Sequence, residues 1–192
     1  MRMLARLSRS IAAFPRARGG VSAVEFAMIA PVFVLILAGV ADIGSVLHAK
    51  FRLNGAVSSG ANYAIVNGEQ ANADDGEVLA RSLLSILADT PYGRSGRSYV
   101  HVNGGVYMSL AAGVASIGGD KDEAANCYCP ASSGSGIDWG QPMTCQAPCS
   151  AGGLAGKYVL MSVEVDHSPL FGGGYGLLEN GKVSARAVVQ VQ

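Results

Sequence analysis

The sequence predicts an α+β protein whose small extracytoplasmic domain is carried by one long N-terminal membrane helix. Three observations lead to this fold class. An uncharged run fills residues 26–41, helical spacing of apolar residues continues beyond it, and alternating apolar segments of strand length occupy the C-terminal half. A chain of 192 residues has room for one globular domain besides an anchor.

The charges are separated along the chain. Beyond the N-terminal cluster the chain holds nine basic and 14 acidic residues without a basic block, so nucleic acid is not an expected partner. A cationic head before an apolar run predicts a cytoplasmic N-terminus and a body on the other side of the membrane. The cluster precedes the first acidic residue, Glu25, and consists of Arg2, Arg6, Arg9, Arg16 and Arg18.

The first predicted element is a membrane helix. Residues 21–47 contain only Glu25 and Asp42 as charged residues, and a bilayer core is spanned by roughly 20 mostly apolar residues. Pro31 removes one backbone donor within this helix and is expected to bend it locally.

Three interpretations of this segment compete. Residues 38–41 (AGVA) provide the small residues of a secretory cleavage site, but the basic region would be long and a carboxylate would begin the apolar run. An uncleaved anchor is the second interpretation. The third rests on residues 19–26 (GGVSAVEF), which resemble the processing site of type IV-like pilins and pseudopilins.

That resemblance implies cleavage by a prepilin peptidase after Gly20, which makes Val21 the new N-terminus. Glu25 is then the fifth mature residue and Phe26 the aromatic residue that often follows it. The longer run RGGVSAVEFAMIAPVFVLILAGVADIG, about thirty residues, is similar to the TadE/TadF proteins of tight-adherence pilus systems. The rest of the chain resembles that family only in layout.

The resemblance implies a TadE-like minor pseudopilin of a Tad/Flp-type (type IVb) pilus, in a system that serves cell adhesion and biofilm formation. It implies a single-pass protein of the bacterial inner membrane with a periplasmic C-terminal domain. The expected partners are the membrane, a prepilin peptidase, and other pilins and pilus-assembly proteins. No enzyme activity, cofactor or small-molecule substrate is expected. The alternative function is an uncleaved, membrane-anchored binding module.

Glu25 has a physical role in this interpretation. A carboxylate deep in a bilayer costs about 2.5–3.5 kcal/mol on insertion scales, although one turn from the helix end it can reach the headgroups. Cleavage after Gly20 would free an α-amine on Val21 that is normally protonated near neutral pH. In a bundle, that amine of one subunit is expected to pair with Glu25 of its neighbour.

A stalk is predicted to extend the helix to about residue 67. Two rows of small residues follow a four-residue spacing: Ala56, Gly60 and Ala64 in one, Gly55 and Ser59 in the other. Such rows allow helices to approach closely, either in a filament or against the chain's own domain. The domain organisation expected is a leader at residues 1–20, helix and stalk at 21–67, and an extracytoplasmic domain at 68–192.

Within that domain the pattern predicts one helix and four strands. Residues 67–73 read as a loop, Asp74 or Asp75 as the cap of a helix that ends near residue 88, and Pro91 as its stop. The expected strands are residues 99–102, 106–110, 158–165 and 183–191, the first two joined by a turn at residues 103–105.

A polar loop at residues 118–156 holds all four cysteines, Cys127, Cys129, Cys145 and Cys149. An even number of cysteines outside the cytoplasm predicts disulfides. Partners two residues apart would be strained, so two bridges between the clusters are expected, in either of two cross-pairings. A Cys₄ zinc site and free thiols are the alternatives.

No catalytic constellation stands out. His48, His101 and His167 share no metal-binding spacing, and the glycine-rich residues 172–176 open no helix that would bind phosphate. Glu164 and Asp166 fall on one face of a predicted strand. Trp139, the single tryptophan, lies in the cysteine loop, where contact with a partner and packing on the bridges are both possible.

Overall fold

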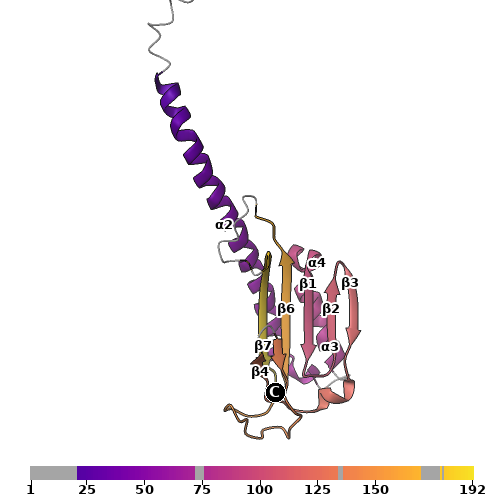
Figure 1. The fold of residues 1–192 in the computed structure, drawn as a ribbon. Helices are drawn as coiled ribbons and strands as arrows, with labels where there is room; N and C mark the ends of the chain where they lie inside the picture. The colour runs from indigo at the N-terminus through magenta and orange to yellow at the C-terminus, as the bar shows by residue number, and fades with distance from the viewer. Residues whose placement is uncertain (1–20, 72–75, 134–135, 170–177, 179) are drawn as a thin grey trace, which may run out of the picture. The chain divides into compact units, whose positions relative to one another are not determined.

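The computed structural model describes residues 21–71, 76–133, 136–169, 178 and 180–192 (Figure 1). The chain divides into two compact units, one ending at Ile43 and the other comprising Gly44–Gln192. A long N-terminal helix, a small antiparallel sheet with helices, and two disulfides confirm the predicted fold class.

Helix α2 comprises Val21–Val66 and continues through Pro31 without interruption. Up to Ile43 its large apolar side chains are exposed, with Phe26 at 72% and Leu35 at 67%. Within the described residues, α2 is the one helix long and apolar enough to cross a membrane, by length and composition. The predicted membrane helix is therefore present as a single helical element that also supplies the stalk.

The domain is built on a five-stranded antiparallel sheet with the order β3-β2-β1-β6-β7 (Figure 1). Four of its strands confirm the alternation in the sequence, whereas β3 was not predicted. The strands are β1 (Arg97–Val102), β2 (Tyr107–Ala111), β3 (Val114–Gly118), β6 (Tyr158–Asp166) and β7 (Lys182–Gln190). The predicted hairpin turn is also present, since Asn103 and Gly104 both have positive φ.

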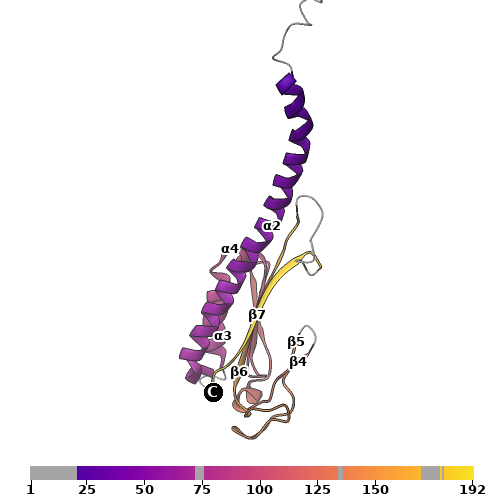
Figure 2. The same ribbon diagram turned by 90° about the vertical axis from the view of Figure 1, so that its left-hand side faces the viewer.

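One face of the sheet is covered by α3 (Glu77–Ala88) and by the part of α2 that belongs to the domain (Figure 2). The core lies between them, because apolar residues at helical spacing meet alternate residues of the strands. The side chains that are fully buried there include Leu53, Leu79, Leu83, Leu87, Val100, Val102, Met161 and Val163.

The rows of small residues on the stalk have different environments. Ala56, Gly60 and Ala64 are buried against the chain's own domain, and a Cβ added at Gly60 would lie 2.9 Å from the Met161 sulfur. Gly55 and Ser59 are exposed, with nothing within 4 Å of a Cβ added at Gly55. Of the two alternatives left by the sequence, the first row therefore packs on the domain.

This difference gives a matched pair of substitutions. Gly60→Leu is expected to destabilise the domain by about 1–3 kcal/mol, because the added side chain overpacks the contact with Met161. Gly55→Leu is expected to stabilise it by about 0.8–1 kcal/mol, because glycine is a poor helix former and the site is open. Thermal unfolding of both variants in detergent tests this; equal effects would contradict the assignment of the buried row.

The segment between stalk and sheet departs from prediction in three places. Residues 67–73 contain a short 3₁₀ helix, η3 (Gly68–Ala71), rather than only loop. The N-cap of α3 is Gly76, with φ 78°, while Asp74 and Asp75 lie outside the described residues. Pro91 does not merely follow the end of α3: it begins helix α4 (Pro91–Ser95), where a missing N–H costs nothing.

Candidate functional sites: the N-terminal helix and the disulfide-linked loop

The N-terminal site begins where α2 begins. Gly20 and the arginine cluster lie outside the described residues, and Val21 is the first residue of the helix. Glu25 stands one turn later with an exposed side chain, followed by the exposed Phe26. The structure thus places the proposed first and fifth mature residues one turn apart on the same helix.

The apolar part of α2 is exposed around its circumference within its own unit. Residues 24, 28, 29, 32–37 and 40 all carry large apolar side chains that are at least half exposed. A helix that is apolar on every side is stable inside a membrane or a protein core. Together with the length of α2, this exposure supports a single-pass membrane anchor.

The second site is the loop between β3 and β6. It contains η5 (Lys121–Ala125) and a small hairpin of β4 (Ala131–Ser133) and β5 (Gly136–Asp138). Disulfides join Cys127 to Cys145 and Cys129 to Cys149, which confirms two bridges between the clusters and resolves which cross-pairing forms. With all four sulfurs in disulfides, the alternative Cys₄ zinc site is not formed.

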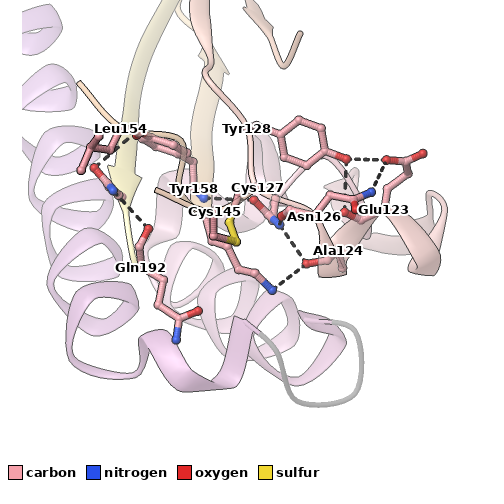
Figure 3. Close-up of a disulfide and its surroundings, with 12 residues drawn as sticks. Glu123, Ala124, Asn126, Cys127, Tyr128, Cys145, Leu154, Tyr158 and Gln192 are labelled. Atoms are coloured by element: carbon pink, nitrogen blue, oxygen red, sulfur yellow. Dashed lines mark hydrogen bonds between the residues drawn. A yellow bond between two sulfur atoms is a disulfide. The ribbon is translucent and has the colours of Figure 1, made fainter. Parts of the chain in front are cut away.

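The disulfide-linked loop is attached to the sheet by Asn103, a fully buried residue of the β1–β2 turn. Its Nδ2 donates to the carbonyl oxygens of Ala124 (2.8 Å) and Asn126 (2.6 Å), and its Oδ1 accepts the Tyr158 N–H (3.3 Å). The Lys157 amine also donates to the Ala124 carbonyl, at 3.0 Å. Figure 3 shows these carbonyls beside the Cys127–Cys145 bridge.

Burial changes the acid–base properties around this attachment. Desolvation lowers the pKa of the Lys157 amine. Desolvation and a hydrogen bond to the Glu123 carboxylate raise the pKa of Tyr128 to about 12. The Tyr128 hydroxyl also donates to the backbone carbonyl of Glu123 at 3.2 Å (Figure 3), so it stays protonated while it holds η5.

The loop also contacts the sheet through aromatic rings. Trp139 meets the His101 ring edge-on at a centroid distance of 4.9 Å and Tyr128 at 5.9 Å. His101 is further flanked by Tyr99 and Tyr107, each with a centroid 5.9 Å away. These rings lie on the face of the sheet opposite the helices, since His101 alternates with the core residues of β1. Trp139 therefore packs on the sheet and covers the part of its second face around His101.

His101 should make the attachment of the loop sensitive to acid. Burial lowers the pKa of its imidazole, an effect partly opposed by backbone hydrogen bonds with Gly104 and Gly105. Below pH about 6.5 the unfolded chain binds a proton that the folded protein resists, so stability should fall as the pH falls through this range. Denaturant unfolding from pH 7.5 to 4.5 measures how the free energy of unfolding depends on pH. The His101→Gln variant should lose the part of this pH dependence that comes from His101.

A matched control is His48, which is exposed. His48→Gln should leave the pH dependence unchanged. If stability depended on pH equally in the wild type and the His101 variant, His101 would not be the source of the acid sensitivity.

Two of the remaining polar residues singled out in the sequence, Glu164 and His167, have structural partners. Glu164 accepts from the Lys182 amine at 2.6 Å, and Ser45 Oγ lies 3.2 Å from His167 Nε2. Residues 172–176 lie outside the described part of the chain. Among the residues that are described, no three His, Cys, Asp or Glu side chains gather in a way that would hold a metal ion.

Sequence reasoning missed the two attachments of the cysteine loop. Asn103 was assigned only to a turn, although a turn asparagine followed by glycine was visible, and its buried amide contacts residues 21 and 23 positions away. The edge-on contact of Trp139 with His101 depends on the path of the loop across the sheet, for which the sequence holds no periodic signal. Both attachments are long-range contacts.

Comparison with known proteins connects the N-terminal site to a family. Residues 20–62 match the family described as "TadE-like protein", a region that begins at the proposed leader end and includes the apolar helix and most of the stalk. No curated protein and no solved structure matches the chain. Over residues 20–62, the N-terminal helix and most of the stalk are similar to the TadE-like family.

Proposed function

We propose that this protein is a minor pseudopilin that is processed after Gly20 and takes part in assembly of a Tad/Flp-type pilus. The observation that carries the proposal is the family match, which covers residues 20–62 and so includes Gly20, Glu25 and the apolar part of α2. The exposed apolar circumference of the helix supports insertion in the inner membrane. The arginine-rich N-terminus favours a cytoplasmic leader and a periplasmic domain.

The proposed mechanism is physical rather than catalytic. Cleavage leaves an ammonium group on Val21, and Glu25 of an adjacent subunit pairs with it when the helix enters the assembly. The pair fixes the axial register of one helix against the next. The disulfide-linked domain then presents contacts to other pilins and pilus-assembly proteins in the periplasm.

The site of processing tests the proposed class directly. The intact mass and N-terminal peptide are measured from membranes of cells with and without their prepilin peptidase. A start at Val21 that depends on the peptidase is the expected result. A start at Met1 would instead indicate the uncleaved binding module, and a start near Asp42 a secreted domain.

The pairing of Glu25 is tested by Glu25→Gln, which removes the charge and keeps the shape. Loss of the pair is expected to cost about 3–5 kcal/mol in the assembled bundle, enough to abolish surface pili while the leader is still removed. Glu69→Gln, at an exposed carboxylate of the domain, is the matched control and should leave piliation intact. Normal piliation in Glu25→Gln would refute the proposed register.

A further inference from the structure

A polar hollow of about 620 Å³, the β7 hollow, lies along edge strand β7 and reaches α2. Three of the side chains that line it are cations: Lys50 comes from α2, and Lys182 and Arg186 come from β7. Among the described lining residues Glu164 is the one carboxylate, so three cations against one carboxylate leave a net charge of +2. The other polar residues of the lining can all donate hydrogen bonds: Asn54, Ser162, Asn180 and Ser184.

The contacts within the β7 hollow leave its positive charge in place. Lys182 Nζ donates to Glu164 Oε1 at 2.6 Å, and the Arg97 guanidinium lies 3.9 Å from the same oxygen, so the carboxylate already has two cations beside it. Lys50 donates to the neutral backbone carbonyl of Ser184 and keeps its charge. Ammonium and guanidinium groups form their strongest hydrogen bonds with carboxylate and phosphate oxygens. The lining therefore favours an anion with several acceptor oxygens.

The backbone of β7 supplies further donors. The Asn103 N–H donates to the Tyr158 carbonyl, and this bond sets the alternation of backbone hydrogen bonds from β1 through β6 to β7. With that register, Ser184 and Arg186 direct their N–H groups away from β6, on the open side of the edge strand. Both residues line the β7 hollow, so backbone donors and cationic side chains lie along the same strip of the surface.

The β7 hollow lies toward the end of the domain from which α2 leads to its apolar segment. Ser45 Oγ lies 3.2 Å from His167 Nε2, one residue beyond β6, so this end of the sheet lies beside the start of the domain's part of α2. The apolar segment ends near residue 47, and headgroups extend about 5–7 Å beyond the hydrocarbon core on each side of a bilayer. At about 1.5 Å per residue, roughly three to five residues of helix cross that layer. With α2 in a membrane, Lys50 therefore lies among the headgroups.

The other end of the sheet is acidic. Helix η5 lies beside the β1–β2 turn, because Asn103 bonds the Ala124 carbonyl, and it carries Asp122 and Glu123 against Lys121. An anionic bilayer surface attracts cationic side chains near it and repels carboxylates. The charges of the domain are thus distributed as expected for a domain whose cationic end lies against anionic lipids.

We infer that the β7 hollow binds the phosphate of an anionic phospholipid headgroup. The phosphate oxygens accept hydrogen bonds from Lys50, Lys182 and Arg186, and the contact gives the domain an attachment to the bilayer besides α2. The inference goes beyond the proposed function but rests on its placement of α2 in the membrane.

The experiment reconstitutes the full chain in nanodiscs that contain phosphatidylcholine and phosphatidylglycerol in equal amounts. Native mass spectrometry then counts the lipids that stay bound to the released protein, and we expect phosphatidylglycerol to be enriched. A cation near an anionic bilayer contributes about fivefold in affinity, so Lys182→Gln with Arg186→Gln should lower the retention of phosphatidylglycerol by up to about 25-fold.

The matched control is Arg81→Gln with Lys121→Gln. It also removes two cations, both of which pair with Glu77 at the start of α3, and it should leave the retention of phosphatidylglycerol unchanged. Thermal unfolding in detergent verifies that the variants are folded. Arg186→Gln alone changes one exposed side chain and should lower the retention by about fivefold, which keeps the test valid if the double variant is unstable.

Three results would overturn the inference: equal retention of the two lipids by the wild type, equal retention of phosphatidylglycerol by the two double variants, or displacement of phosphatidylglycerol by excess inorganic phosphate. The last result would identify a site for dissolved phosphate instead of a lipid. A chain that does not enter the nanodiscs counts against the membrane placement in the proposed function. A chain that enters them without preferring phosphatidylglycerol counts against the β7 hollow alone.

Discussion

Replacing Asn103 by glycine is expected to lower the free energy of unfolding by about 2–4 kcal/mol, because each buried polar group left without its partner costs about 1–3 kcal/mol. The substitution removes the bonds to Ala124, Asn126 and Tyr158 together, while Lys157 still donates to Ala124. Glycine is the informative replacement: Asn103 has φ 51°, a conformation that glycine adopts without strain. Denaturant unfolding in detergent, followed by Trp139 fluorescence, measures the loss.

The chain supplies its own control for this experiment. Asn180 has φ 55° in the turn before β7 and is exposed. Asn180→Gly changes the same side chain in the same backbone conformation and should shift stability by less than about 0.5 kcal/mol. If the two variants were equally stable, the buried amide would not be what attaches the cysteine loop to the sheet.

Removing either disulfide by alanine pairs is expected to destabilise the protein by about 2–4 kcal/mol. The two bridges close loops of similar length, with sequence separations of 18 and 20, so the loss of chain entropy in the unfolded state is nearly the same for both. A difference between them must then come from the folded state. Cys127 is only 2% exposed, although its partner Cys145 is exposed, whereas Cys129 and Cys149 are both partly exposed.

The variant without the Cys127–Cys145 bridge should accordingly be the less stable one, by roughly 1 kcal/mol, about the transfer free energy of one buried methylene-sized group. The Cys129–Cys149 variant is the matched control. Urea unfolding of the two variants and the wild type under oxidising conditions provides the comparison. The reverse order of stability would show that the Cys129–Cys149 bridge contributes more to the native packing.

The elements that were predicted correctly have a local signal. The alternation in β1, β2, β6 and β7, the apolar face of α3 and the length of α2 all repeat within a few residues. Strand β3 lacks such a signal, because its sequence VASIG is small and exposed on both faces at the edge of the sheet. The start of α4 was readable: Thr90 caps it, and Pro91 at the first position is favoured there.

The features of the candidate sites differ in how far apart along the chain the residues that determine them lie. Cysteine spacing narrowed the disulfides to two cross-pairings, and only the fold distinguishes Cys127–Cys145 from Cys127–Cys149. Gly60 and Gly55 are equivalent in sequence, yet one faces Met161 and the other solvent. The position of Asn103 under η5 likewise requires the path of residues 119–157 to be known. Contacts between segments far apart in the chain were thus the part that the sequence could not supply.

The shared helix also has a mechanical consequence. Leu53 and Val57 of α2 belong to the domain core, so this part of the helix cannot leave the domain without opening that core. A force applied along α2 would act parallel to its contacts with the sheet. All of these contacts would then bear the force at the same time. The domain would then yield by losing its core.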